Sequence, residues 1–259
     1  MTIESVCILD AGGQFTKVID RRLRELNVHC VIRPASTPIS ELSSYKGIVI
    51  SGGPSSVGDA NAPKVEPDLL FKLDNTPILG ICWGMQFITA VFGGQVKPLD
   101  KREDGVFDID ITEPDSALFK EMEPRQSVLL THGDSAVSVP DDLKTIAKSG
   151  SIIAAVQHKS RPIFGVQFHP EVDLTANGVK ILSNFVDVCG CERDYTDDYR
   201  DELAINEIKA KVGESGKILV LVSGGVDSSV LAALCYKAVG VDRVKCIHID
   251  NGFMRLGKT

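Results

Sequence analysis

The sequence predicts an α/β fold, in which a mostly parallel sheet flanked by helices is followed by a shorter α/β unit. Short buried-strand patterns alternate with helical spacing of apolar residues along the first third of the chain. Glycine-rich loops follow several of these strands, and a further strand, glycine-rich loop and helix come after a charged segment near residue 200. Such alternation is typical of strand–helix–strand units in a parallel sheet.

The expected elements follow from the period of the apolar residues. Short apolar runs predict strands at residues 6–9, 29–33, 47–50, 77–81, 127–130, 146–147, 152–157 and 163–167. Helical spacing predicts helices at residues 18–26, 85–92 and 179–186, with a short helical or turn segment at 39–42. Alternating residues between 96 and 112 predict antiparallel strands added to the parallel core.

Composition narrows the class of protein. With 259 residues, 43% of them hydrophobic, the chain can build one large or two modest cores. The net charge of −7 and the lack of a Lys/Arg cluster argue against a nucleic-acid partner. No run reaches membrane-spanning length and no signal peptide is recognisable. Seven cysteines without paired zinc-type spacing predict reduced thiols in the cytosol and no metal site.

A change in composition marks a domain boundary. Residues 192–202 are charged and almost free of aliphatic side chains, which is typical of an exposed connector. We therefore expect one domain over residues 1–191 and a second over residues 203–259, beginning with a helix at about 203–212. About sixty residues are too few to close the sheet of this second domain, so we expect it to be incomplete.

Cys82 is the candidate nucleophile. The segment Gly80-Ile-Cys82-Trp-Gly84 lies where a predicted strand meets a predicted helix, and small flanking residues permit the strained turn of a nucleophile elbow. A larger side chain at either glycine should clash. The helix dipole favours a thiolate here, and the N–H of Trp83 is free to face an oxyanion. The alternative is a buried, inert cysteine.

Two further stretches support this hypothesis. His169 and Glu171 follow a predicted strand and are separated by one proline, so they can project together as a base and the carboxylate that orients it. Backbone N–H groups around Gly52 and Gly53, at the end of another strand, can complete an oxyanion hole. A solvated histidine and an ordinary turn are the respective alternatives.

A second glycine-rich loop predicts an anion site. A buried strand at residues 217–222 is followed by a loop of small and hydroxyl residues and by a helix at 230–239, and backbone and hydroxyl donors there can surround phosphate oxygens. The loop comprises Ser223, Gly224, Gly225, Val226, Asp227, Ser228 and Ser229. The Asp227 carboxylate can bind Mg²⁺ or accept hydrogen bonds from the loop's own backbone. Residues 252–259 match a Walker A pattern, but no helix follows, so we expect no Walker site.

The first three motifs, Gly-x-Cys-x-Gly, Ser-Gly-Gly-Pro and Phe-His-Pro-Glu, together resemble the class I glutamine amidotransferases, whose fold is flavodoxin-like. The resemblance implies that Cys82 attacks L-glutamine, that His169 and Glu171 complete the triad, and that no cofactor is needed for glutamine hydrolysis. It also implies that Gln86 contacts glutamine. His132 and Asp134, in a loop near the pocket of that family, are expected to have supporting roles.

The second loop resembles the PP-loop of the N-type ATP pyrophosphatases, and the two halves together resemble the glutamine-hydrolysing GMP synthetases. That resemblance implies ATP and Mg²⁺ as cofactors, and xanthosine 5′-monophosphate (XMP) as the substrate that ammonia converts to GMP. We expect this chain alone to be at most a glutaminase. A non-catalytic glutamine-binding or regulatory module is the alternative. An amidotransferase of CTP, anthranilate or carbamoyl phosphate synthesis is disfavoured by the second loop.

Overall fold

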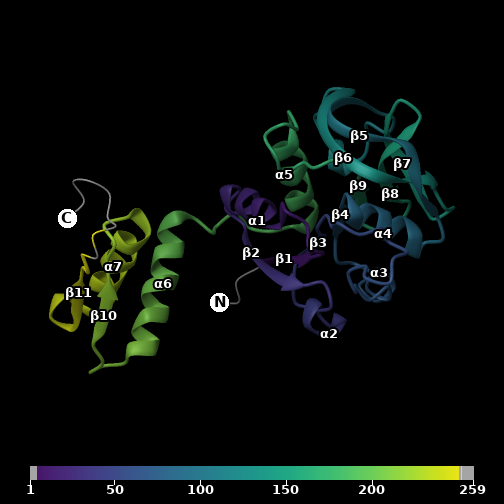
Figure 1. Ribbon diagram of the computed structural model, residues 1–259. Coiled ribbons are helices and arrows are strands. Elements are labelled where there is room, and N and C mark those ends of the chain that lie inside the picture. The colour runs from purple at the N-terminus through teal and green to yellow at the C-terminus, as the bar shows by residue number, and fades with distance from the viewer. Residues whose placement is uncertain (1–4, 251, 253–259) are drawn as a thin grey trace. The chain divides into compact units, whose positions relative to one another are not determined.

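The computed structural model describes residues 5–250 and residue 252 (Figure 1). By its internal contacts the chain divides into two compact units, residues 1–193 and residues 194–259. We call these unit 1 and unit 2 and treat each by itself. In the part of the chain that the structure describes, no helix combines the length and the apolar character needed to cross a bilayer.

Unit 1 is built on a nine-stranded mixed sheet, within the described residues, with the strand order β2-β1-β3-β4-β9-β8-β7-β5-β6. The first five strands of this order pair in parallel and the last five pair antiparallel, with β9 common to both sets. The parallel strands are β1 (Ser5–Asp10), β2 (His29–Pro34), β3 (Gly47–Ile50), β4 (Ile78–Ile81) and β9 (Ile163–Val166). The antiparallel extension adds β5 (Gln95–Ile111), β6 (Arg125–Ser138), β7 (Leu143–Ser149) and β8 (Ile152–His158).

Both faces of the inner parallel strands β1, β3, β4 and β9 are buried, because helices cover each side. Successive side chains of a strand point to opposite faces, and β1 shows this directly: Val6 and Ile8 join one core cluster, while Cys7 and Leu9 join the other. The first cluster is closed by α1 (Thr16–Glu25) and α5 (Gly178–Cys189), and the second by α2 (Ile39–Leu42), α3 (Leu69–Lys72) and α4 (Trp83–Val91). A short 3₁₀ turn, Ala117–Phe119, packs against α5. The predicted α/β fold class is thus confirmed for unit 1.

Unit 2 is a single strand–helix–strand arrangement preceded by a helix. Its parallel strands β10 (Ile218–Leu221) and β11 (Val244–Ile247) are joined by α7 (Val226–Val239) and a 3₁₀ turn, Val241–Arg243. α6 (Asp197–Val212) packs against α7. The core is small: its buried members are Val220, Ala232, Cys235, Ala238, Val239 and Val244.

Several element boundaries differ from the sequence prediction, and three of them bear on the candidate sites or the domain boundary. α6 begins at Asp197 rather than near residue 203, because the Thr196 hydroxyl caps the Tyr199 N–H and two aspartates favour the positive helix end. α7 begins at Val226, so the last four residues of the second loop are already helical. Residues 131–134, predicted as a loop after a strand, lie inside the long strand β6. The Walker-like segment falls, except for Gly252, outside the described residues.

Candidate active site

The turn around Cys82 has the strained geometry of a nucleophile elbow. Cys82 lies between β4 and α4 with φ 52° and ψ −103°, a left-handed conformation that costs a non-glycine residue energy. Its N–H donates to the Val166 carbonyl at 2.7 Å. A Cβ on Gly80 would lie 2.4 Å from the Gly84 carbonyl carbon, and one on Gly84 would lie 2.3 Å from the Ile50 oxygen. Both glycines are therefore sterically required, as the sequence predicted.

The predicted base and its carboxylate meet directly after β9. The Nδ1 atom of His169 lies 2.8 Å from Oε1 of Glu171, and both side chains are buried. The backbone at this point is held on both sides: the His169 N–H donates to the Leu129 carbonyl at 3.1 Å, and the Thr175 hydroxyl donates to the His169 carbonyl at 2.6 Å. This leaves Nε2 of His169 as the ring atom available to the thiol, because Nδ1 is occupied.

His169 has Cys82 and Glu171 as neighbours, since it is bonded to Glu171 and borders the same cavity as Cys82, and the two groups set its charge state. Burial opposes protonation of the imidazole, but the interactions with Cys82 and Glu171 outweigh burial and raise the pKa of His169 from 6.5 to about 10. Glu171 is 1% exposed, and its second oxygen, Oε2, has no hydrogen-bond partner among the described residues. The carboxylate charge is therefore directed at the imidazole.

The glycine loop after β3 lies against the same centre. A Cβ on Gly52 would be 3.3 Å from Cε1 of His169 and 3.7 Å from Cβ of Cys82, so only a bare backbone lets the loop approach this closely. The Ser51 hydroxyl anchors the loop by accepting from the Ala11 N–H at 2.9 Å. Trp83 is the first residue of α4, and such an N–H has no acceptor within its own helix. The structure thus gathers Gly52, Gly53 and Trp83 around the thiol.

Cys82 is 8% exposed and lies on the wall of two adjoining cavities. The first, of about 280 Å³, is bordered by the glycine loop after β1 (residues 12–16) and by His169. The second, of about 240 Å³, has a mostly polar wall that includes Gln86, Arg102 and Asp134. A polar cavity that ends at a nucleophile suits a small, polar, zwitterionic ligand.

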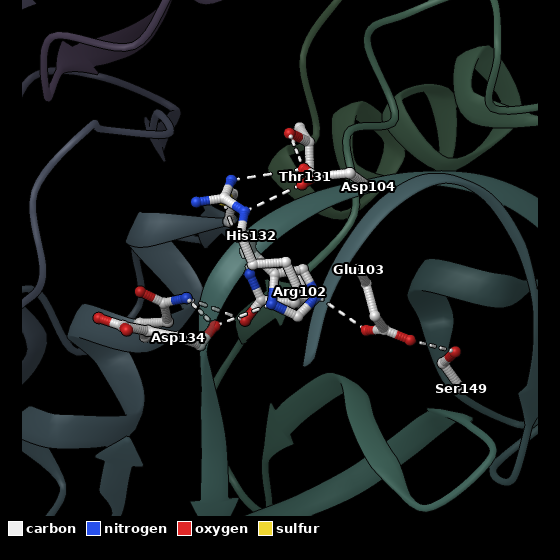
Figure 2. Close-up of polar contacts among 10 residues, drawn as sticks. Arg102, Glu103, Asp104, Thr131, His132, Asp134 and Ser149 are labelled. Carbon is white, nitrogen blue, oxygen red and sulfur yellow. Dashed lines mark hydrogen bonds and ion pairs between the residues drawn. The ribbon is translucent and has the colours of Figure 1, made fainter. Parts of the chain in front are cut away.

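Gln86 and His132, which both line the second cavity, belong to one hydrogen-bonded network, and Figure 2 shows the part of it around His132. The Gln86 amide nitrogen donates to the Asp134 carbonyl at 2.8 Å and lies 3.2 Å from Oε1 of Gln167. The Gln167 amide in turn donates to the Cys82 sulfur at 3.6 Å. The sequence analysis missed Gln167. Its position could have predicted a role in the site, because residues two apart in an extended chain point to the same side, and Gln167 lies two residues before His169.

The second glycine-rich loop is organised but exposed. The Ser228 hydroxyl lies 3.2 Å from the Ser223 N–H and donates to the Gly225 carbonyl at 3.1 Å, and the Ser229 hydroxyl donates to the same carbonyl at 2.9 Å. Gly224 has φ 75°, which turns the backbone at the start of α7. Small residues, hydroxyl groups and a helix N-terminus are the donor set that fits a pyrophosphate.

Family models agree with this division of the chain. The model described as glutamine amidotransferase class-I matches residues 7–189, and the model described as NAD synthase matches residues 201–254. The chain therefore belongs to the class I glutamine amidotransferase family, as the first set of motifs predicted.

Similar proteins carry a more particular name. The chain is 50% identical to GMP synthase [glutamine-hydrolyzing] of Dictyostelium discoideum over 97% of its length and 37% of that protein. It is 46% identical to the Brachyspira hyodysenteriae protein of the same name, over 98% of this chain and 49% of that one. The chain thus spans less than half the length of these curated relatives.

A solved structure from Thermoplasma acidophilum, described as one subunit of a putative GMP synthase, superposes with a TM-score of 0.65. It is 32% identical and covers 78% of this chain and 98% of its own. The resemblance to the GMP synthetases stated from the sequence is borne out by these relatives.

Proposed function

We propose that unit 1 hydrolyses L-glutamine to glutamate and ammonia through the triad Cys82, His169 and Glu171. The observation that carries the proposal is the convergence of the three groups: Cys82 and His169 border one cavity beside Gly52, and His169 is bonded to Glu171 at 2.8 Å. This order of nucleophile, base and orienting carboxylate is the arrangement that nucleophilic acyl transfer requires.

In the proposed reaction the Cys82 thiolate attacks the side-chain amide carbon of glutamine while His169 holds the proton. The oxygen of the tetrahedral intermediate is stabilised by the Trp83 N–H and by the backbone at Gly52 and Gly53. His169 then protonates the nitrogen, ammonia leaves and a glutamyl thioester remains. Water, deprotonated by His169, attacks the thioester, and the proton passes to the leaving sulfur as glutamate is released. Gln86 contacts the bound glutamine from the second cavity.

In the complete enzyme, we propose, this ammonia aminates XMP to GMP in an ATP-dependent reaction in the cytosol. The names of the relatives and the NAD synthase match after residue 200 support this. Residues 1–191 form the amidotransferase domain, residues 192–202 connect it to the nucleotide-binding part, and this connecting segment is helical from Asp197 onward. There Ser223, Ser228 and Ser229 with the loop backbone from Gly224 to Asp227 hold the pyrophosphate. Bound ATP with Mg²⁺ supplies the activation of the XMP oxygen.

The test is to incubate the purified chain with glutamine and to measure glutamate release, with Cys82→Ala as the matched control. We expect steady glutamate release from the wild type and a loss of at least about a thousandfold in the variant. Glutamine binding to both proteins is measured by calorimetry. Binding without Cys82-dependent release would support a glutamine-binding module instead, and the absence of both would overturn the glutamine assignment.

A further inference from the structure

A buried ionisable pair, Glu103 and His132, lies at the second cavity, which His132 lines, on the neighbouring strands β5 and β6 (Figure 2). Oε2 of Glu103 is 2.9 Å from Nε2 of His132, and Oε1 accepts from the Ser149 hydroxyl at 2.9 Å. The two side chains are 8% and 4% exposed. Desolvation of a buried pair opposes folding, whereas a network in which every polar atom is bonded holds its members rigidly.

The hydrogen bonds of His132 define where its protons are. Nδ1 faces the backbone carbonyl of Asp134 at 2.8 Å, and a carbonyl can only accept, so Nδ1 carries a hydrogen. One further proton lies between Nε2 and the Glu103 carboxyl group. The ring is therefore held at both ends and cannot rotate without breaking a buried bond.

The Asp134 carbonyl is the point at which this pair meets the candidate active site. The same oxygen accepts from the Gln86 amide, which continues through Gln167 to the Cys82 sulfur. The Asp134 carboxylate accepts from the Ser56 hydroxyl across the second cavity. Glu103 itself does not line either cavity. His132 is part of the wall of the second cavity, and Glu103 holds His132 from outside both cavities.

We propose that Glu103 and His132 are a positioning pair for glutamine: they hold the Gly133–Asp134 backbone and the Gln86 amide in the arrangement that receives the substrate. This inference rests on the proposed function and extends it to residues that do not touch the reacting atoms. Loss of the pair weakens recognition of glutamine and leaves the reactivity of the Cys82 thiol unchanged.

The proposal is tested by alkylation of Cys82 with two reagents. A chloromethyl ketone analogue of glutamine reports recognition in the cavity, and iodoacetamide reports thiol reactivity alone. Modification at Cys82 is followed by mass spectrometry in the full chain. In the wild type we expect the analogue to be much faster than iodoacetamide, and glutamine to protect against it.

Three variants separate positioning from folding. Glu103→Gln keeps the network, since its amide can donate to Nε2 of a neutral His132 and accept from Ser149, so we expect rates close to wild type. Glu103→Ala removes the anchor of the ring. The double variant Glu103→Leu/His132→Phe replaces both partners by apolar groups of similar size, which preserves folding. For the last two we expect the analogue rate to fall roughly tenfold to a hundredfold, with the iodoacetamide rate unchanged.

Ser116→Ala is the matched control, because it removes a buried hydrogen bond, to Gln157 at 2.7 Å, elsewhere in unit 1. It should alter neither rate. Equal analogue rates in wild type and double variant would overturn the positioning role while leaving the glutamine site intact. A parallel fall in both rates, in variants that remain folded, would also overturn it. An analogue that reacts in the wild type no faster than iodoacetamide would instead refute the glutamine site itself.

Discussion

Units 1 and 2 each contain a strand that ends in small residues and continues into a helix, yet the two turns have opposite surroundings. In unit 1 all four residues of β4 are buried, and α4 is buried from Trp83 to Thr89. In unit 2 Leu219 and Leu221 of β10 are 60% and 62% exposed while Val220 between them is 3% exposed. The described residues cover only one face of β10, so its side chains alternate between buried and exposed.

The difference shows what a glycine-rich turn does by itself and what it needs from neighbouring layers. The turn at Cys82 has a cavity on each side because β3, β9 and their loops enclose it. The turn at residues 223–229 has an ordered hydrogen-bonded backbone, but its residues remain largely exposed. Local sequence shapes the turn in both units, whereas enclosure comes only from non-local strands.

The largest effect is expected where unit 1 has no free space. In Gly84→Val the first side-chain carbon would lie 2.3 Å from the Ile50 carbonyl oxygen. Relieving this clash requires β3 or α4 to move. We expect a loss of more than about 3 kcal/mol in the free energy of unfolding, measured by urea denaturation. The control is Gly58→Ala, which has nothing within 4 Å, and should lie within about 0.5 kcal/mol of wild type.

The same substitution in each unit sharpens the comparison. Leu182→Ala in α5 removes a fully buried side chain and should cost about 2–5 kcal/mol. Leu219→Ala in β10 removes one that is 60% exposed and should change stability by no more than about 0.5 kcal/mol. Hydrogen exchange monitored separately on peptides of α5 and β10 reports each effect in its own unit. A large loss of protection in β10 would show that this face is covered in solution.

Measuring the free energy of unfolding at a series of pH values tests the interactions that raise the pKa of His169 in the enclosed site. Because the folded state raises the pKa of His169 to about 10, its stabilising contribution is complete below pH 6.5 and is lost as pH rises toward 10. The difference in unfolding free energy between wild type and His169→Gln should therefore shrink over this range, by at most about 1.4 kcal/mol per pH unit. A difference that stays constant would contradict the ion-pair geometry.

His158 has a pKa shift opposite in direction to that of His169, so its effect on stability should depend on pH in the opposite way. Burial, and then the neighbouring Arg161, lower the pKa of His158. Its neutral form is favoured in the folded state, so its contribution is present above pH 6.5 and is lost as pH falls below it. The unfolding free energies of wild type and His158→Gln should move apart as the pH rises through this lower range. In the same range the difference between wild type and His169→Gln is constant.

The smallest effect concerns the start of unit 2. Thr196→Ala removes the hydroxyl that accepts from the Tyr199 N–H at 3.3 Å and should destabilise the first turn of α6 by about 1 kcal/mol. Faster amide exchange at residues 197–200 measures it, and Thr196→Ser should restore the cap. Exchange in Thr196→Ala that matches wild type would mean that the helix begins later, as the charged composition had predicted.

The sequence was sufficient for the elements of unit 1 whose signals are local. Apolar runs located the parallel strands, and the glycines on either side of Cys82 predicted a turn that tolerates no side chain. It was insufficient at the start of α6, where the charged composition predicted an exposed connector. The acidic residues near 197 instead form the first turn of the helix, because the Thr196 cap and the helix dipole favour them there. It also misplaced residues 131–134, because long-range pairing with β5 extends β6 through them.

By itself the sequence determined the strand–turn–helix units and the chemical groups available for the site, because periodicity and turn chemistry depend on neighbours along the chain. Only the tertiary structure decided that Cys82, His169 and Glu171 share one centre, that Gln167 donates to the sulfur, and that Glu103 is paired with His132. Apart from the local pair of His169 and Glu171, those contacts join segments that are far apart in the sequence, and their geometry depends on the register and order of the sheet.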